Sequence, residues 1–239
     1  MGKIAAIVPA AGLGTRMGAE LPKQFLELDG VPLLVFTLRR LAACAEIDEF
    51  FIATRGDVAA IQDLISRAQL GRPARVVQGG DTRHQSVANA LTQVDASVEI
   101  VVVHDAVRPF VTPEQVSRVI AEARSRGAAI LGIPAIDTVK EVKRASLPED
   151  VALISATIPR ERIVLAQTPQ VFSCALLREA FRKAQEDEFT GSDEAALVER
   201  LGRDVFVVLG SERNLKITRP ADMDLARFYL DQERKARHA

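Results

Sequence analysis

The feature that most constrains the fold is an apolar run near the start of the chain, from Ile4 to Val8, followed at once by the loop Pro9-Ala10-Ala11-Gly12-Leu13-Gly14. A continuous run of small and branched apolar residues predicts a strand buried on both faces, as in parallel sheets covered by helices. The loop leaves the carboxyl end of this strand, and its glycines and alanines allow a ligand to approach the main chain closely. Main-chain N–H groups in such a loop can face phosphate oxygens, and Arg16 and Lys23 add positive charge soon afterwards. The stretch therefore favours a polyphosphate site.

The glycines of this loop fit neither of two common nucleotide-binding motifs. Gly12 and Gly14 match the opening of the dinucleotide-binding fingerprint, but Met17 occupies the position of its third glycine and Gly18 comes one residue late. The Lys-Ser/Thr ending of the P-loop is missing as well. An ordinary strand-to-helix turn is the alternative interpretation, and the two nearby cations are what favour a phosphate site over it.

Composition limits the number of domains and the kinds of partner. The chain has 239 residues, of which 48% are hydrophobic, and we expect a single domain over residues 1–239. Its net charge is -1 and no long charged run occurs, so we expect binding to neither nucleic acid nor membrane. Cys44 and Cys174 lie far apart without zinc-binding spacing, and no signal segment or membrane span is evident, so we expect a cytoplasmic protein.

Apolar periodicity predicts strands and helices that alternate along most of the chain. The predicted strands after the first cover residues 49–54, 75–78, 99–104, 128–133 and 205–209. The predicted helices run from Pro32 to about Cys44, over 58–68 after a cap at Asp57, around 87–94, and over 113–126, 174–185 and 192–201, with a last one that begins at Pro220. We expect residues 231–239 to form a frayed, solvated tail. The alternation predicts an α/β fold with a Rossmann-like, doubly wound, mostly parallel sheet.

The alternation stops between about residues 137 and 167. Two polar and β-branched segments, 138–143 and 152–158, flank a turn that contains Pro148 and Asp150, which predicts a β-hairpin. A two-stranded hairpin buries too little apolar surface to be stable alone. We therefore expect a protruding β-arm that packs on another subunit.

An acidic and a basic residue follow the predicted strand 99–104, in the order His104-Asp105-Ala106-Val107-Arg108. Open α/β sheets bind ligands at the carboxyl ends of their strands, so Asp105 is a candidate ligand for Mg²⁺ and Arg108 a candidate partner for a substrate phosphate. The alternative is an aspartate that caps the following turn, with the arginine paired to it. We expect His104 to orient this turn rather than to take part in catalysis.

Two further stretches carry candidate binding residues. Gly79, Gly80, Asp81 and Ser86 follow another predicted strand, and main-chain groups around the glycines are candidates for recognising a base. A glycine turn capped by Asp81 is the alternative. Lys216 lies in a short, apolar, strand-like segment and needs a neighbouring anion, either a ligand phosphate or a carboxylate of the fold.

The glycine loop with Arg16, followed by Pro22-Lys23-Gln24-Phe25, resembles the signature of nucleotidyltransferases that move a nucleoside monophosphate onto a small phosphate ester. Over nearly the whole chain, the order and spacing of the motifs resemble the 2-C-methyl-D-erythritol 4-phosphate cytidylyltransferase family. The motifs are P-A-A-G-x-G-x-R-M-G, P-K-Q-F, G-G-x-x-R-x-x-S-V, H-D-A-x-R-P, D-T-V-K, P-R-E followed by A-Q-T-P-Q, and N-x-K-I-T-R-P. The chain departs from the family at Arg162-Ile163-Val164-Leu165, where a tryptophan is common, and at Ser192, where threonine is usual.

This resemblance implies transfer of CMP from CTP to 2-C-methyl-D-erythritol 4-phosphate with release of pyrophosphate, in non-mevalonate isoprenoid precursor biosynthesis. It also implies a homodimer joined by the β-arm, and Mg²⁺ with Asp105 as its protein ligand. The implied catalytic charges are Arg16, Lys23 and Lys216. The implied CTP-binding residues are Pro9, Ala10, Ala11, Gly12, Gly14, Gly79, Gly80, Asp81 and Ser86. The implied substrate-binding residues are Asp105, Arg108, Thr138 and Arg160, the last reaching in from the other subunit.

Three rival functions remain as alternatives. The ribitol-5-phosphate cytidylyltransferases share the fold and most motifs but tend to open with A-G-G where this chain has P-A-A-G. A hexose-phosphate nucleotidyltransferase or a GT-A glycosyltransferase is disfavoured by the short chain and by the lack of a D-x-D motif in the central strands. A non-catalytic nucleotide-binding regulator could lose its cations, whereas Arg16, Lys23 and Lys216 are all present.

Overall fold

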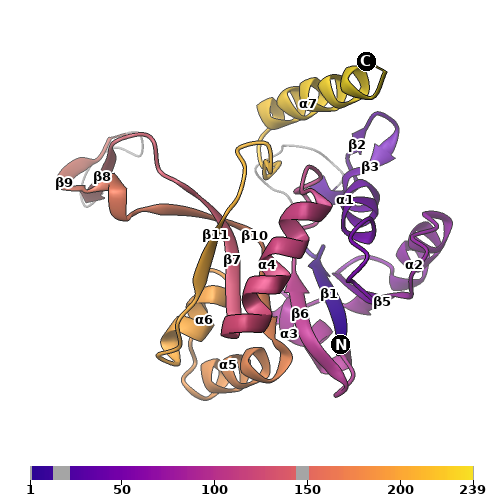
Figure 1. Cartoon of the computed structure of the whole chain (residues 1–239), viewed down its shortest axis with the longest axis horizontal. Coiled ribbons are helices and arrows are strands. Elements are labelled where there is room, and N and C mark those ends of the chain that lie inside the picture. Colours follow the sequence, from indigo (N-terminus) through magenta and orange to yellow (C-terminus); the bar gives the residue numbers. More distant parts are fainter. Residues whose placement is uncertain (1, 13–21, 144–150, 239) are drawn as a thin grey trace.

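A computed structural model of the chain describes residues 2–12, 22–143 and 151–238. Gly14 and Arg16, which the sequence places in the site, lie outside these ranges, as does the expected turn at Pro148 and Asp150. Figure 1 shows a central sheet with helices on both faces and a two-stranded arm that projects to one side. The position of each functional residue follows from this arrangement.

The described residues form a seven-stranded sheet in the order β11-β7-β10-β6-β1-β4-β5. Its strands are β1 (Lys3–Pro9), β4 (Glu49–Thr54), β5 (Ala74–Gln78), β6 (Val98–Val103), β7 (Ala128–Pro134), β10 (Val164–Ser173) and β11 (Phe206–Leu209). Neighbouring strands pair in parallel except at β10, which is antiparallel to both β6 and β7. The predicted doubly wound, mostly parallel α/β fold is confirmed.

Strand β10 is missing from the predictions made above. Its pairing with β7 shifts register between Ala166 and Gln170, and Pro169 lies inside that shift. Because proline has no N–H and interrupts a ladder, the strand does not show an uninterrupted strand pattern in the sequence. Residues 164–167, which the predicted arm included, therefore belong to the main sheet.

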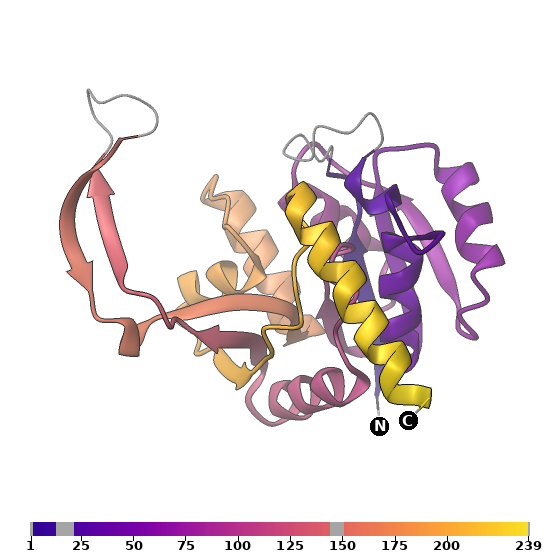
Figure 2. The same ribbon diagram turned by 90° about the horizontal axis from the view of Figure 1, so that it is seen from above.

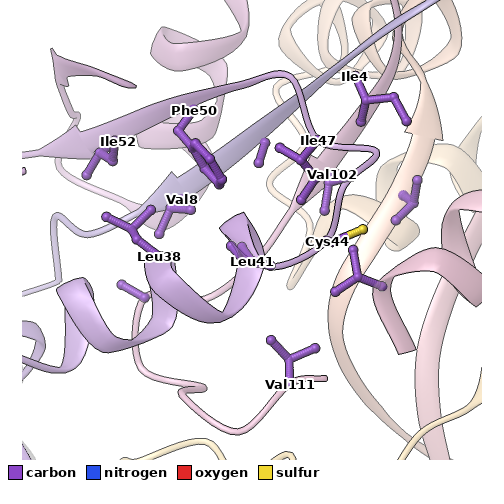
Figure 3. Packing of buried hydrophobic residues seen from close by; sticks show 14 of the residues in the cluster. Ile4, Val8, Leu38, Leu41, Cys44, Ile47, Phe50, Ile52, Val102 and Val111 are labelled. Atoms are coloured by element: carbon purple, nitrogen blue, oxygen red, sulfur yellow. The ribbon is translucent and has the colours of Figure 1, made fainter. Parts of the chain in front are cut away.

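Helices pack on both faces of the sheet. One face carries α1 (Leu33–Ala42), α2 (Val58–Arg67) and α4 (Pro113–Arg126), and the other carries α3 (Arg83–Gln93), α5 (Cys174–Glu186) and α6 (Glu194–Arg200). Figure 3 shows Leu38 and Leu41 of α1 in one cluster with Val8, Phe50 and Ile52 of the sheet. Each fully buried side chain of this kind contributes about 1.5–3 kcal/mol relative to an exposed one. Because helices cover both faces of the sheet, its central strands can carry continuous apolar runs without exposing them to water.

The arm consists of β8 (Val139–Lys143) and β9 (Leu153–Ile158), which pair antiparallel. Figures 1 and 2 show it extending away from the sheet, joined to β10 through the short 3-10 helix η3 (Arg160–Arg162). Its apolar side chains remain uncovered, since Leu153 is 63% exposed and Ile154 is 57% exposed. The protruding β-hairpin is therefore present, with an apolar surface that nothing in the described chain covers.

The last helix, α7 (Pro220–His238), packs on the small hairpin of β2 (Glu27–Leu28) and β3 (Val31–Pro32). Its Met223 and Ala226 share an apolar cluster with Leu28. The prediction of a frayed tail from residue 231 is wrong, because α7 continues to His238. Within this part of the helix, Glu233 pairs with Arg40 and Arg234 pairs with Asp29. Among all described residues, no helix combines the length and apolar character needed to cross a bilayer.

Candidate active site

The loop after β1 forms one wall of a cavity at the carboxyl edge of the sheet. Ala10 donates its N–H to the carbonyl of Ala53 at 2.7 Å and accepts from Gln24 Nε2 at 2.6 Å. Gln24 belongs to the 3-10 helix η2 (Lys23–Phe25), so the same bond holds Lys23 beside the loop. The two motifs at the start of the chain are thereby joined in one structure.

The cavity has a volume of about 210 Å³. It lies beside β1 and β6. The chain passes from β1 to β4 and β5 on one side of β1 and then crosses back to β6 on the other side, and open α/β sheets bind ligands at such a reversal of strand order. Its described lining consists of Pro9, Ala10, Ala11, Gly12, Lys23, Gln24, Asp81, Thr82, Arg83, Ser86, Asp105, Ala106, Val107 and Lys216. Residues from five separate motifs thus meet at one cavity.

Two predicted glycines lie just behind this lining. A Cβ added at Gly79 would lie 3.0 Å from Ala11 Cβ, and one added at Gly80 would lie 2.4 Å from Gln85 Cβ. Gly80 also donates its N–H to Ser86 Oγ at 3.1 Å. Gly79 therefore allows the turn before α3 to pack closely against the loop after β1, and Gly80 allows the same turn to pack against Gln85 of α3.

The cap of α3 differs from the alternative raised above. Thr82, and not Asp81, is the N-cap: its side chain accepts from Gln85 N–H, and Gln85 bonds back to Thr82. Threonine followed three residues later by glutamine is a capping box, which satisfies two helix donors at once. Asp81 instead pairs with Arg55 at 3.2 Å and faces the cavity. Its carboxylate is therefore available at the cavity rim.

Asp105 follows β6 and has three cationic partners among the described residues. Lys216 Nζ lies 2.9 Å from Oδ2, Arg83 Nε donates to Oδ1 at 3.0 Å, and Arg108 Nε lies 3.6 Å from Oδ2. Burial alone would raise the pKa of Asp105, but the charges of Arg83, Lys216 and Arg108 outweigh burial and hold that pKa far below its usual value. Asp105 is therefore ionised throughout the working pH range of an enzyme.

Lys216 lies in an irregular segment, not in the strand-like one that its apolar neighbours suggested. The main chain is tied to the turn after β6, since Ile217 donates its N–H to the carbonyl of Val107 at 2.9 Å. The carboxylate of Asp105, one of the two anions considered for Lys216, lies 2.9 Å from its amine. The Lys216 side chain is nevertheless 39% exposed, so it can turn toward a ligand in the cavity. Lys23 Nζ donates to the Ile217 carbonyl at 3.5 Å, which brings the two amines to the same wall.

Arg108 is buried and is not part of the described cavity lining. Its Nη1 donates to the carbonyl of Asn214 at 2.7 Å, and burial lowers its pKa despite the attraction of Asp105. Arg108 thus pairs with Asp105 and with the main chain at Asn214, and its role at a substrate phosphate stays a prediction.

His104 holds the turn in which Asp105 sits. Its Nε2 lies 3.1 Å from the carbonyl of Arg108, and its Nδ1 lies 3.2 Å from Thr168 Oγ1. Thr168 Oγ1 in turn accepts from the N–H of Asp105 at 3.0 Å. Burial lowers the pKa of His104 to about 4, so the ring is neutral near pH 7 and orients the turn.

Arg83 and Glu194 take part in the site although no residue role was predicted for either. Arg83 Nη1 donates to both carboxylate oxygens of Glu194, at 2.7 and 2.9 Å, while its Nε contacts Asp105. Glu194 is 1% exposed, and burial raises its pKa while Arg83 opposes that rise. The only sequence signal was Arg83 itself, in the motif G-G-x-x-R; nothing connected it with a carboxylate 111 residues later.

Thr138 and Arg160 lie in or beside the arm and outside the described lining of the cavity. Arg160 Nη1 donates to the carbonyl of Ile136 at 2.6 Å, and its Nε lies 3.8 Å from Glu161. Both residues are exposed. Within one chain, the structure does not bring them to the other candidate residues.

The donor set suits a Mg²⁺ ion bound mainly by nucleotide phosphates. No group of three or more His, Cys, Asp or Glu side chains that could hold a metal occurs among the described residues. Mg²⁺ is commonly bound by one or two carboxylates together with substrate phosphates. A carboxylate has about four lone-pair positions, so Asp105 can still accept a metal beside Arg83 and Lys216.

Comparisons with known proteins agree on one family. The sequence profile of the 2-C-methyl-D-erythritol 4-phosphate cytidylyltransferase family matches residues 4–232. A protein of that name from Acidobacterium capsulatum is 50% identical over 237 residues, covering 96% of this chain and 98% of the relative. Another from Solibacter usitatus is 47% identical over 239 residues, covering 97% of each chain.

Solved structures are similar over the same length. The 4-diphosphocytidyl-2C-methyl-D-erythritol synthase from Anaerococcus prevotii gives a TM-score of 0.82 at 32% identity, covering 96% of this chain and 99% of that one. The 2-C-methyl-D-erythritol 4-phosphate cytidylyltransferase from Thermus thermophilus gives a TM-score of 0.76 at 35% identity, covering 95% and 98%. Sequence and structure comparisons therefore agree over nearly the whole chain.

Proposed function

The chain belongs to the 2-C-methyl-D-erythritol 4-phosphate cytidylyltransferase family, and from this premise we propose how its site transfers CMP from CTP to 2-C-methyl-D-erythritol 4-phosphate. The transfer releases pyrophosphate and forms 4-diphosphocytidyl-2-C-methyl-D-erythritol, a step of non-mevalonate isoprenoid biosynthesis. The observation that carries the proposal is that Lys23 and Lys216 line the same cavity as the main chain from Pro9 to Gly12.

In the proposed complex the triphosphate lies along the loop after β1. Main-chain N–H groups face its oxygens, and Lys23 and Lys216 counter its charge. The family motif adds Gly14 and Arg16 to this loop. The base lies at the turn before α3. Neighbouring atoms leave no room for a side chain at Gly79 or Gly80, so the main chain is close to the cavity there, and Asp81 and Ser86 face the cavity.

The acceptor needs no general base from the protein. A phosphate monoester has a second pKa of about 6, so near pH 7 it is largely dianionic and already nucleophilic. One of its oxygens forms a bond to the α-phosphorus of CTP as the bond to the bridging oxygen breaks, and pyrophosphate leaves with that electron pair. Positioning and charge stabilisation are then the main tasks of the site.

Lys216 is the residue best placed to stabilise the charge that develops around the reacting phosphorus. In this structure its amine is held by Asp105 at 2.9 Å on the cavity wall, and its partly exposed side chain can move to an α-phosphoryl oxygen. Negative charge accumulates on those oxygens during displacement, so a lysine there stabilises the transition state more than the bound substrate. Asp105, released from Lys216, can then accept from an acceptor hydroxyl.

Asp105 would hold a Mg²⁺ ion together with the nucleotide phosphates, and the ion would supply further charge neutralisation at the triphosphate. The chain's own part is to keep Asp105 ionised, which the charges of Arg83, Lys216 and Arg108 support by lowering its pKa.

We further propose that the arm joins two subunits and that Thr138 and Arg160 act on the acceptor bound at the neighbouring cavity. The exposed apolar side chains of the arm and the position of Arg160 outside its own cavity support this proposal. A single domain is supported by the two apolar clusters that share one sheet. A reducing cytoplasm is supported by Cys44 and Cys174, which are both free and buried.

The deciding assay measures pyrophosphate released from CTP in the presence of each acceptor. Release should require 2-C-methyl-D-erythritol 4-phosphate, and mass spectrometry should identify its diphosphocytidyl product. Ribitol 5-phosphate is the matched control, since it tests the rival cytidylyltransferase activity. Faster turnover with ribitol 5-phosphate, or release without any acceptor, would count against the proposal.

A further inference from the structure

An ion pair between the partly buried Arg83 and the fully buried Glu194 lies at the reacting side of the cavity. Glu194 accepts two hydrogen bonds from Arg83 Nη1, and Arg83 Nε donates to Asp105, which also binds Lys216. The four side chains therefore form a chain of alternating charge that runs from α6 to the cavity. Glu194 itself is not part of the described cavity lining, so it acts on a ligand only through Arg83.

The position of Glu194 is determined by the sheet. Gln170 of β10 donates from Nε2 to Asp193 at 2.8 Å and accepts the N–H of Ala195 at 3.1 Å. These two bonds flank Glu194 and hold the start of α6 against β10, and Gln170 is itself buried. Glu194 is thus a carboxylate held in a fixed position, and its hydrogen bonds fix the guanidinium of Arg83 as well.

The three cations around Asp105 differ in their freedom to move. Arg83 is anchored by Glu194, and Arg108 is buried and anchored by the carbonyl of Asn214. Lys216 has the most exposed side chain of the three, at 39% compared with 28% for Arg83 and 10% for Arg108. Lys216 is therefore the partner that can leave Asp105 while the other two keep its charge compensated.

We propose that Glu194 and Arg83 are a positioning pair, which fixes Asp105 and leaves Lys216 free to exchange between Asp105 and the reacting phosphate. This inference rests on the proposed function. Without Glu194, Arg83 would engage Asp105 more strongly, in competition with Lys216. Without Arg83, Asp105 would retain Lys216 more tightly and lose its fixed orientation.

The first test separates positioning from structural support. Breaking a buried ion pair is strongly destabilising, whereas replacing both members by apolar residues of similar volume is often neutral. The double variant Arg83→Met/Glu194→Leu should therefore melt close to the wild type and still lose about tenfold to hundredfold in kcat. Wild-type kcat in the folded double variant would overturn the proposal. A raised KM for CTP with unchanged kcat would also overturn it, because Arg83 would then only bind the nucleotide.

The second test measures how accessible the amine of Lys216 is, and it requires no enzymatic turnover. A short pulse of acetic anhydride labels accessible amines, and mass spectrometry gives the labelling rate of Lys216 relative to the exposed Lys235. Glu194→Gln should raise that relative rate several-fold, because Arg83 then competes better for Asp105. The double variant should lower it, because Lys216 then loses a competitor.

The matched control is Glu199→Gln, the same substitution at an exposed position of the same helix, which should leave the rate unchanged. Equal labelling in Glu194→Gln, Glu199→Gln and wild type would overturn the positioning role. If the wild type released no pyrophosphate, the proposed function would fail, and the labelling would still report on the pair.

Discussion

Replacing Lys216 by alanine tests the site most simply, because it removes one amine that faces both Asp105 and the cavity. A unit charge about 4 Å from a phosphoryl oxygen, at an effective dielectric constant of about 20, contributes about 4 kcal/mol. The transferred group gains less than a full charge in the transition state, so we expect a loss of about 10² to 10³ in kcat, the range seen when an oxyanion donor is removed.

The affinity for CTP should change much less than kcat in Lys216→Ala, since Lys23 and the main chain of the loop still bind the triphosphate. The fold should persist, because Asp105 keeps Arg83 and Arg108 as partners. Steady-state kinetics, CTP titration by calorimetry and a melting curve measure the three quantities, with Lys235→Ala as the matched control. Equal losses in CTP affinity with kcat unchanged would refute the transition-state role of Lys216.

Three further predictions concern the metal, the turn and the arm. Chelation by EDTA should abolish activity and Mg²⁺ should restore it, while Asp105→Asn should lower Mg²⁺-dependent turnover without unfolding the protein; full activity in EDTA would remove Asp105 from any metal role. The free energy of unfolding should fall by about 3 kcal/mol as pH drops from about 6.5 to 4, because the unfolded chain protonates His104 at its ordinary pKa of 6.5, whereas burial lowers that pKa to about 4 in the folded protein. In His104→Gln, denaturant unfolding at a series of pH values should show a weaker pH dependence of the unfolding free energy over this range. An unchanged pH dependence would show that another group causes the effect. Co-expressed Arg160→Ala and Lys216→Ala chains should recover about a quarter of wild-type activity if each site draws Arg160 from the other subunit, whereas verified heterodimers without recovery would rule that out.

The regular elements were predictable wherever local signals agreed. Strand β4 and helix α4 have the predicted bounds, because Pro113 and Arg126 sit at the two ends of a clear apolar periodicity. Strand β10 was not predictable, because Pro169 interrupts its pattern and only pairing with β6 and β7 makes it a strand. The length of α7 likewise depends on tertiary ion pairs to Arg40 and Asp29.

The site was predictable where its residues belong to one motif or lie at one strand end. The loop from Pro9 to Gly12, Lys23 and Asp105 meet because strands β1 and β6 are neighbours with the same direction. The pair of Arg83 and Glu194 was not predictable, since an ion pair across 111 residues leaves no local pattern. Thr138 and Arg160 remain predictions, because one chain alone does not bring them to the cavity.

Direct transfer between two substrates is the central claim, and the path of the α-phosphorus tests it most directly. CTP labelled with radioactive phosphorus at the α-position would be incubated with the protein, Mg²⁺ and 2-C-methyl-D-erythritol 4-phosphate, and the label located by chromatography. The account predicts that the label passes from CTP into the diphosphocytidyl product, in proportion to the pyrophosphate released. Label that accumulates in CMP or on the protein would contradict direct attack by the acceptor phosphate.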